Sequence, residues 1–428
     1  MKIVKKVLMA FGIILLLIGL ADILWVFGPP ILASRKIEDI DQYAKKVNEI
    51  SLKEEIKVVA LGEASHGNVE FQELRLSLLQ DLVEKEGVRS FVLEADFGEG
   101  LLINEYIHGG SENLEDVIKN LSFTIYQTKE TKDLIQWMRE YNEKVEEKDK
   151  LSFYGFDMQN PEKGLSLLAN FCKENPSLGE QNLQRIMKFF SHEKSENKKD
   201  NKEEIIQSLK SIQEQLIKDK DSLTDPQMAQ LFSRQITCIL NSIEYYDKDM
   251  SDYAGMNNIR DKFMADNVKW IQKFEEDKGN PRILIAGHNG HVGYKASFYK
   301  PMGAHLKETL GQDYFVIGTD YFKTTSNINA MGRDSGRGNY KFNSADPLAA
   351  QAKYFEGMYY LDFNGIREKE STTYEKISKP MSMGSLGEGY SILMKFLPTS
   401  HRIKDVPKDL YDGMIFVYEG SPIVPKLD

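Results

Sequence analysis

The sequence predicts an α/β fold in which a mainly parallel sheet is flanked by helices and carries a helical insertion, with one transmembrane helix preceding it. Three observations predict this: an apolar run near the N-terminus, short apolar segments alternating with helix-periodic ones, and a long central stretch without strand signals. With 428 residues, 41% of them hydrophobic and 11% aromatic, the chain has enough apolar side chains for a full-sized core.

The first 36 residues differ from the rest of the chain. Three lysines among residues 2–6 precede an apolar run from Val7 to Phe27, in which Asp22 is the one charged residue and which Pro29-Pro30 closes. A run of this length is long enough to cross a bilayer.

A cleaved secretory signal is the alternative interpretation, because Ile31 to Ser34 weakly resembles a cleavage site. Lysines ahead of an apolar run favour the inner side of the membrane. We therefore expect a single-pass anchor in the cell membrane, residues 1–36, followed by an extracellular domain over residues 37–428.

Seven short segments rich in β-branched and aromatic residues are predicted to be strands. They are Ile56–Leu61, Ser90–Leu93, Leu151–Phe156, Arg282–Ala286, Tyr314–Thr319, Met358–Phe363 and Met414–Tyr418. Several are apolar on both faces, as in a buried parallel sheet. Helical patterns such as Glu70–Lys85 and Thr131–Lys148 lie between the early segments, so right-handed crossovers are expected.

Residues Gly164 to about Lys278 show no strand signal and are predicted to form a helical insertion between two strands. Apolar residues recur at helical spacing over 205–216 and 228–243. The charged stretch His192–Glu204 is interpreted as a solvated loop and helix start.

Charge and cysteine content limit the partners. The net charge is −10 and the pI is about 5.4, with lysines mixed among acidic residues, so nucleic acid is not an expected partner. The two cysteines, Cys172 and Cys238, lie in helix-like surroundings without metal-ligand spacing. We interpret them as buried thiols, between which a disulfide is possible but not implied.

Four polar motifs each begin where a predicted strand ends. They contain Glu63 with His66, Glu94, Asp157, and His288 with His291. Because ligands bind at the carboxyl edge of an open α/β sheet, these side chains are expected to converge on one cleft. The helical insertion is expected to pack as hairpins over the sheet and to form one wall of this cleft.

Each motif also has a purely structural interpretation. Glu63, Glu94 and Asp157 are placed where a carboxylate caps a following helix, and Arg75 is placed where a helix faces solvent. His288 and His291 are harder to explain in this way, because two imidazoles at a buried strand end need partners or water. The joint placement of the motifs favours an active site.

Taken in chain order, the motifs resemble those of the erythromycin esterase family. They are GExxHG at residues 62–67, Glu70-Phe71 and Arg75, LEAD with Glu94, GFDxQ at 155–159, RDxxMAxN at 260–267 and AGHNxH at 286–291, with further similarity at 300–303 and 310–314. The resemblance covers essentially the whole soluble part. It implies hydrolysis of a small-molecule ester or macrolactone without a known covalent intermediate and without a cofactor.

The resemblance also assigns residues to the family's positions. Its essential histidine falls on His66, its motif glutamate on Glu63, its arginine on Arg75, its second glutamate on Glu94, and its later histidines on His288 and His291. The residues agree with this, because the sequence has no GxSxG elbow and neither cysteine lies in a strand-end motif. An acyl-enzyme on Ser or Cys is therefore not favoured.

Ester hydrolysis needs a base and oxyanion donors. His66 is the natural general base if Glu63 or Glu94 orients its ring, and Arg75, His288 or His291 are candidate donors to the oxyanion. The expected substrate-binding residues are Asp157, Arg260, Gly62 and Gly67, with the two glycines allowing the loop backbone to approach the substrate. Asp261 lies beside Arg260 and is expected near the same cleft.

Two other hypotheses use the same residues. The carboxylates and imidazoles also form a hard-ligand set suited to a divalent metal that would activate water, although no metal is expected from the resemblance. A surface-anchored binding or assembly factor would instead hold a glycan or lipid-linked precursor without turnover.

Two further expectations concern the substrate. An extracellular domain is separated from the ribosome, where macrolides act, which argues against an antibiotic substrate and a resistance role. The Gly- and Ser-rich stretch Thr324–Asp346 is interpreted either as a lid over the cleft or as a mobile surface loop.

Overall fold

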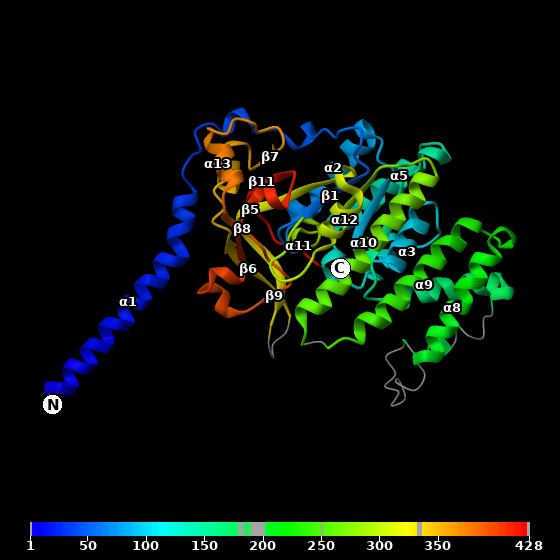
Figure 1. The fold of residues 1–428 in the computed structure, drawn as a ribbon, viewed down its shortest axis with the longest axis horizontal. Coiled ribbons are helices and arrows are strands. Elements are labelled where there is room, and N and C mark those ends of the chain that lie inside the picture. The colour runs from blue at the N-terminus through cyan, green and yellow to red at the C-terminus, as the bar shows by residue number, and fades with distance from the viewer. Residues whose placement is uncertain are drawn as a thin grey trace.

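The computed structural model describes residues 2–178, 183, 185–187, 190, 202–249, 251–331 and 336–425. Most of the charged stretch predicted at residues 192–204 lies outside these residues, and helix α8 (Lys202–Lys218) begins at its end. The predicted fold class is confirmed: a mainly parallel sheet lies between helices, and an apolar helix precedes it (Figure 1).

The described residues form a main sheet of nine strands, and all seven predicted strands belong to it. Its principal order is β3-β2-β4-β1-β5-β11-β7, with bounds Ser152–Asp157, Ser90–Asp96, Ile283–His288, Val58–Glu63, Tyr314–Ala330, Gly413–Gly420 and Met358–Asp362. Neighbours along this order are parallel, except that β7 is antiparallel to β11. β4 therefore lies between β1 and β2, which brings the ends of these three strands to one edge.

Burial on both faces explains the continuous apolar runs of the central strands. Every residue of β1, β2 and β3 is buried. Val58 and Ala60 point into one hydrophobic cluster, whereas Val59 and Leu61 point into the other. Successive side chains of a strand point to opposite faces, so one strand contributes to both core layers.

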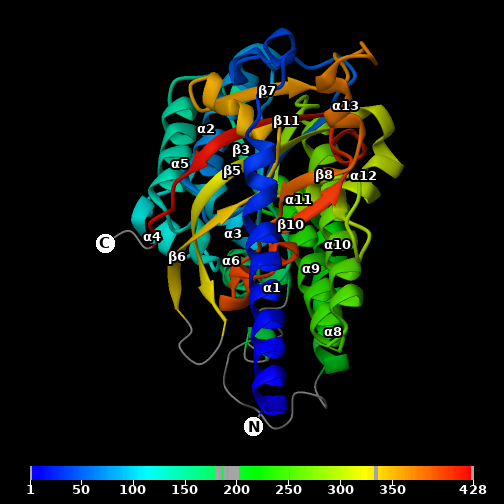
Figure 2. The ribbon, with the colours of Figure 1, turned by 90° about the vertical axis from the view of Figure 1, so that its left-hand side faces the viewer.

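Helices cover both faces of the sheet. Figure 2 shows α2 (Val69–Glu86) and α5 (Lys129–Asn142) on one side and α10 (Tyr253–Asp277) and α12 (Met302–Leu310) on the other. The shorter helices are α3 (Phe97–Ile107), α4 (Leu114–Lys119), α11 (Asn289–Val292), α13 (Thr372–Ser378) and α14 (Pro407–Leu410).

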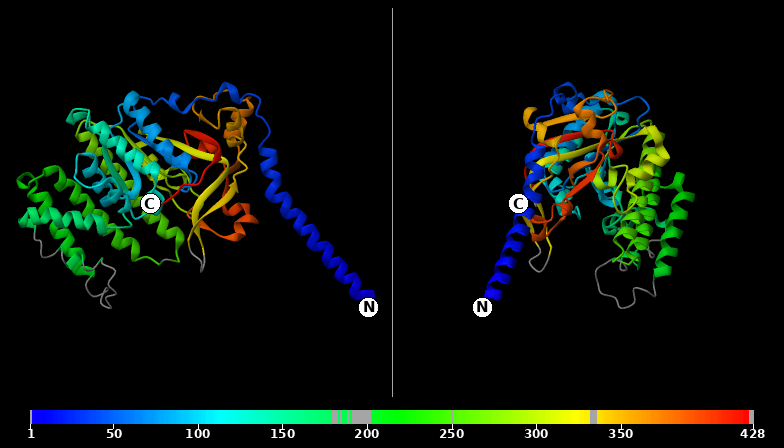
Figure 3. Two further views of the ribbon diagram at one scale, coloured as in Figure 1. Left: turned by 180° about the vertical axis from the view of Figure 1, so that it is seen from behind. Right: turned by 60° about the vertical axis from the view of Figure 1, so that its left-hand side comes forward.

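The described residues between β3 and β4 contain helices and no strand, as predicted. They include α6 (Glu162–Glu174), α8, α9 (Pro226–Tyr246) and α10. α10 packs against β3 and α12, while α8 and α9 form a hairpin at the end of the molecule far from α1 (Figure 3). We expected the whole insertion to pack over the sheet, but α10 makes most of this contact. The buried cysteines, Cys172 and Cys238, lie in α6 and α9.

The stretch interpreted as a lid or mobile loop, Thr324–Asp346, is mostly a β-hairpin. β5 continues to Ala330 and pairs antiparallel with β6 (Arg337–Asn343), while residues 332–335 lie outside the described part of the chain. Buried and partly exposed side chains alternate along the extension of β5, as in a strand with one buried face. β9 (Gly389–Tyr390) also pairs with β5, and β8 (Met381–Gly384) pairs with β10 (Arg402–Asp405) in a separate small sheet.

Helix α1 (Lys2–Ala33) projects away from the body (Figures 1 and 2). It continues through Pro29 and Pro30, and Pro30 O accepts a hydrogen bond from Ser34 N. Its most apolar window has a mean hydropathy of 2.7 and is not buried against the rest of the structure. By length and composition α1 suits a membrane span, and it equally suits a signal sequence.

Candidate active site

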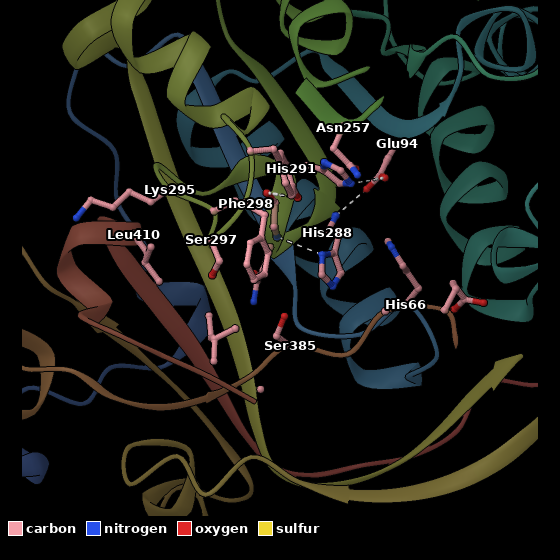
Figure 4. Close-up of a pocket in the computed structure, with 18 of the residues that line it drawn as sticks. His66, Glu94, Asn257, His288, His291, Lys295, Ser297, Phe298, Ser385 and Leu410 are labelled. Carbon is pink, nitrogen blue, oxygen red and sulfur yellow. Dashed lines mark hydrogen bonds and ion pairs between the residues drawn. The ribbon is translucent and has the colours of Figure 1, made fainter. Parts of the chain in front are cut away.

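A cleft of about 580 Å³ opens at the carboxyl edge of the parallel strands (Figure 4). Five of the residues predicted from the sequence line it: His66, Glu94, Arg260, His288 and His291. Glu63, Arg75 and Asp157 contact these residues or their neighbours but do not line the cleft. The predicted convergence therefore holds, with some of the charged groups one layer behind the surface.

His66 lies in the loop between β1 and α2, directly in front of the buried Glu63. Its Nδ1 is 3.5 Å from Glu63 Oε2, while Glu63 Oε1 accepts a hydrogen bond of 2.7 Å from Arg75 Nε. The loop is held by Ala64 N, which donates to Thr319 Oγ1. With Glu63 behind Nδ1, the Nε2 atom of His66 is the ring nitrogen available to the cleft.

The electrostatics of this pair follow from their burial and contacts. Burial by itself would raise the pKa of Glu63, but Arg75 and His66 hold it below its usual range. Burial would also lower the pKa of His66, but Glu63 and Glu94 outweigh this and raise it above the usual 6.5. Glu63 is therefore a fixed negative charge that stabilises a proton on His66.

Arg75 does not act where the sequence predicted. Its side chain is 1% exposed, and its guanidinium lies over the Tyr126 ring with 4.8 Å between its central carbon and the ring centroid. Since Arg75 is turned toward Glu63 and does not line the cleft, it orients the carboxylate rather than an oxyanion.

His288 ends β4 and starts helix α11. Its Nδ1 accepts a hydrogen bond of 3.1 Å from Gly290 N, so the neutral ring carries its proton on Nε2. Burial lowers the pKa of His288 to about 3, with nearby His66 and His291 adding to the effect. Its Nε2 is buried and has no hydrogen-bond partner among the described residues.

The rings of His66 and His288 are neighbours, as Figure 4 shows. Their centroids are 5.1 Å apart, because Glu63 and His288 are paired across β1 and β4. A neutral imidazole with an unpartnered N–H thus lies beside an imidazole that is backed by a carboxylate. This arrangement can supply a base and a hydrogen-bond donor to a single polar group bound in the cleft.

Glu94 and Asp157 are both engaged by Arg260 of α10. Arg260 Nη2 is 2.8 Å from Glu94 Oε1 and 2.8 Å from Asp157 Oδ2, and Glu94 Oε2 accepts from His288 N at 2.8 Å. Burial would raise the pKa of Glu94, but His291 and Arg260 hold it far below its usual range. Glu94 is therefore ionised and positions the His288 backbone.

His291 is oriented by Asp261, which the sequence placed near the cleft without a role. His291 Nδ1 lies 2.9 Å from Asp261 Oδ1, and its Nε2 lies 3.1 Å from Arg260 Nη1. Burial would lower the pKa of His291, but Asp261 and Glu94 raise it. The adjacent positions of Arg260 and Asp261, which lie about two turns into α10, were the sequence signal for this contact.

Gly62 and Gly67 are close to protein atoms rather than to the cleft. A Cβ atom on Gly62 would lie 2.1 Å from Asn289 Oδ1, and one on Gly67 would lie 2.4 Å from Asn327 O. Neither glycine lines the cleft. The structure therefore differs from the expectation that they admit substrate: their small size admits α11 and β5.

Sequence reasoning missed most of the outer cleft. The start of α10 contributes Tyr253 and Asn257, whereas α8 and α9 contribute none of the described lining residues, so only this part of the insertion forms a cleft wall. The remaining lining residues include Phe123, Ile125, Tyr126, Ser297, Phe298, Tyr299, Ser385, Glu388, Ser400, Arg402, Leu410 and Tyr411. These residues lie in loops and short elements, for which periodicity gives no signal.

The donor set does not match the metal hypothesis. Among the described residues, no three His, Cys, Asp or Glu side chains are grouped so that they could hold a metal ion. The carboxylates are already bound by arginines, Glu63 by Arg75 and Glu94 by Arg260, and His288 Nδ1 accepts from the backbone. The contacts of this site favour proton transfer between side chains and substrate.

The sequence of this chain is similar to the sequences of erythromycin esterases. A family model described as erythromycin esterase matches residues 83–420, well over half of the chain. Erythromycin esterase type II of Escherichia coli is 29% identical over 296 residues, which span 61% of this chain and 68% of that protein. Glu63, His66 and Arg75 precede the region matched by the family model.

Two solved structures share the fold at low sequence identity. A protein from Bacillus cereus aligns with a TM-score of 0.73 and 21% identity, covering 92% of this chain and 98% of that one. A mutant erythromycin esterase in its open conformation aligns with a TM-score of 0.64 and 17% identity, covering 90% and 99%.

Proposed function

The chain belongs to the erythromycin esterase family, and we propose that its cleft hydrolyses a carboxylic ester or lactone with water activated by His66, without a covalent intermediate. The observation that carries this proposal is the placement of His66 between the buried Glu63 and the cleft, beside the unpartnered Nε2 of His288. A general base needs a carboxylate behind it and a donor in front of the developing oxyanion.

In the proposed reaction, His66 Nε2 takes a proton from water as the water oxygen attacks the acyl carbon. The carbonyl oxygen becomes an oxyanion, which accepts a hydrogen bond from His288 Nε2–H. The bond from the acyl carbon to the alkoxy oxygen then breaks, and His66 returns its proton to the leaving alcohol. Glu63 stabilises His66 while the ring is positively charged.

The surroundings of the cleft support direct attack by water. Ser297, Ser385 and Ser400 line the cleft, but Ser400 Oγ donates to Leu397 O, and no serine oxygen is hydrogen-bonded to a histidine in the described part of the chain. A serine nucleophile needs a base within hydrogen-bond distance, and no described serine has a histidine in that position.

Hydrolysis is tested by incubating the full chain, in detergent, with a panel of para-nitrophenyl esters, lactones and amides. We expect turnover of esters or lactones that is unchanged by a chelator. If a chelator abolishes the activity and zinc or manganese restores it, a metal ion rather than His66 activates the water. Saturable binding of a glycan or lipid-linked precursor without turnover of any panel member would instead indicate a binding factor.

We also propose that α1 anchors the enzyme in the cell membrane with the hydrolase domain outside. The support is the length and hydropathy of α1 together with the lysines that precede the apolar run. Protease added to intact cells should remove the domain, whereas a domain cleaved only after lysis would contradict this orientation. Release of the whole domain into the medium, without protease, would show that the segment is a cleaved signal.

A further inference from the structure

Three of the cations that the structure describes line the cleft: Arg260, Lys295, which is paired with Asp409, and Arg402, which lies away from the His66 group. Arg402 begins β10, where it is paired with Gly384 of β8, and its Nε donates a 2.7 Å hydrogen bond to Asn343 O. Both Arg402 and Gly384 line the cleft. The backbone contact fixes one edge of the guanidinium and leaves the remaining N–H groups without a carboxylate acceptor among the described residues.

Arg402 differs in this respect from the other arginines around the cleft. Arg260 binds Glu94 and Asp157, Arg75 binds Glu63, and Arg337 binds Glu388. Burial lowers the pKa of Arg402, and only the partly compensating influence of Tyr321 opposes it. A half-buried cation without a counter-ion has lost hydration that a bound anion would replace.

The nearby carboxylates do not take the place of such an anion. Glu388 is held by Arg337, whose Nη1 lies 2.5 Å from Glu388 Oε2. Asp405 Oδ1 accepts a hydrogen bond from Val406 N, and Asp405 makes no ion pair in the described part of the chain. The hydroxyl-bearing residues Ser385 and Ser400 line the same part of the cleft and add polar groups beside Arg402.

Backbone pairing relates Arg402 to the reacting centre. Ser65 is bridged to Leu386, with Leu386 N donating to Ala64 O at 3.1 Å, and Gly384 is paired with Arg402. Strands lie about 4.8 Å apart and advance about 3.3 Å per residue, so the backbone of Arg402 is on the order of 10 to 15 Å from that of Ser65. An anion at Arg402 would thus be several bonds from an ester carbonyl at His66.

We propose that Arg402 is a subsite for an anionic group, a carboxylate or phosphate, on the substrate. The proposal deepens the ester or lactone hydrolysis proposed above and rests on it. The cleft is also lined by Ile125, Phe298 and Leu410, which suit an apolar spacer. The substrate class is therefore an ester whose acyl or alcohol part ends in an anion separated from the ester by an apolar segment.

The kinetic test compares three para-nitrophenyl esters of matched chain length: octanoate, the monoester of suberate, and an octanoate bearing a terminal phosphate. We expect Arg402→Gln to lower kcat/KM for one or both anionic esters by about tenfold or more, with little change for the neutral ester. Arg402→Lys should retain most of the preference. Arg367→Gln, which removes an exposed charge outside the cleft, is the matched control. The suberate and phosphate arms separate the two anions.

A binding measurement separates failure of this inference from failure of the proposed hydrolysis. Calorimetric titration of the full chain in detergent with octyl phosphate and with octanoate should give an affinity that Arg402→Gln weakens by about tenfold and Arg367→Gln leaves unchanged. Loss of binding in Arg402→Gln without turnover by the wild type would support the subsite and overturn the hydrolysis. Equal binding of both anions by wild type and Arg402→Gln would overturn the subsite, whether or not esters are hydrolysed.

Discussion

The ends of β1 and β4 are adjacent and paired in register, yet their histidines have opposite proton affinities. His66, after β1, has Glu63 behind its Nδ1, and its pKa is raised. His288, at the end of β4, has only a backbone N–H at its Nδ1, and its pKa falls to about 3. Both rings are buried, so the carboxylate behind His66, which His288 lacks, separates their pKa values and suits His66 to the proposed role of base and His288 to that of neutral donor.

The largest expected effect comes from removing the base. His66→Asn should lower kcat by roughly a hundredfold to ten-thousandfold, because it removes the group that accepts the proton of water. Steady-state kinetics on an ester identified in the panel measures the loss, and circular dichroism with a melting curve checks the fold. Full activity in a folded variant would show that His66 is structural.

Removing the neutral donor at β4 should have the next largest effect. His288→Phe should lower kcat by about a hundredfold, because it removes one hydrogen-bond donor to the oxyanion. His288→Gln, which keeps an N–H donor, should lose less. A loss in both variants that is matched by a drop in melting temperature would instead point to the contact between His288 Nδ1 and Gly290 N.

Glu63→Gln makes the two histidine environments more alike. Only neutral His66 accepts a proton, so wild-type activity should be lost as the pH falls through a His66 pKa above 6.5. Without the carboxylate this pKa falls, so the acidic limb should move to lower pH, with kcat about tenfold lower. The profile of kcat/KM measured between about pH 5 and 9 tests the shift.

This variant needs a stability control, because Arg75 would be left as a buried cation without its carboxylate. A melting curve shows whether Glu63→Gln stays folded over the same pH range. The proposed role of Glu63 would be contradicted by a folded variant whose acidic limb stays at the wild-type pH.

The smallest effect is expected at the carboxylate behind His291. Asp261→Asn should lower kcat by less than about tenfold, because Asp261 orients a ring that lies farther from the His66 group. It removes the main charge that raises the pKa of His291, so this histidine should titrate at lower pH in an NMR titration. An unchanged titration of the assigned His291 signal would show that Glu94 alone sets its protonation.

The sequence by itself determined the strands and the residues at their ends. Buried strands require apolar runs such as Ser90–Leu93, and a polar residue that follows one directly lies at the carboxyl edge of the sheet, so Glu94, Asp157 and His288 were identified from local pattern alone. Helical periodicity likewise indicated the insertion, because an amphipathic helix repeats over a short window.

Only the tertiary structure decided which groups face one another. The strand order places β4 between β1 and β2, and this sets His288 beside Glu63 and His66. Arg75 turns toward Glu63, and Arg402 reaches the cleft through the pairing of β10 with β8. A contact between residues distant in the chain depends on the packing of whole elements, and no local period of the sequence encodes it.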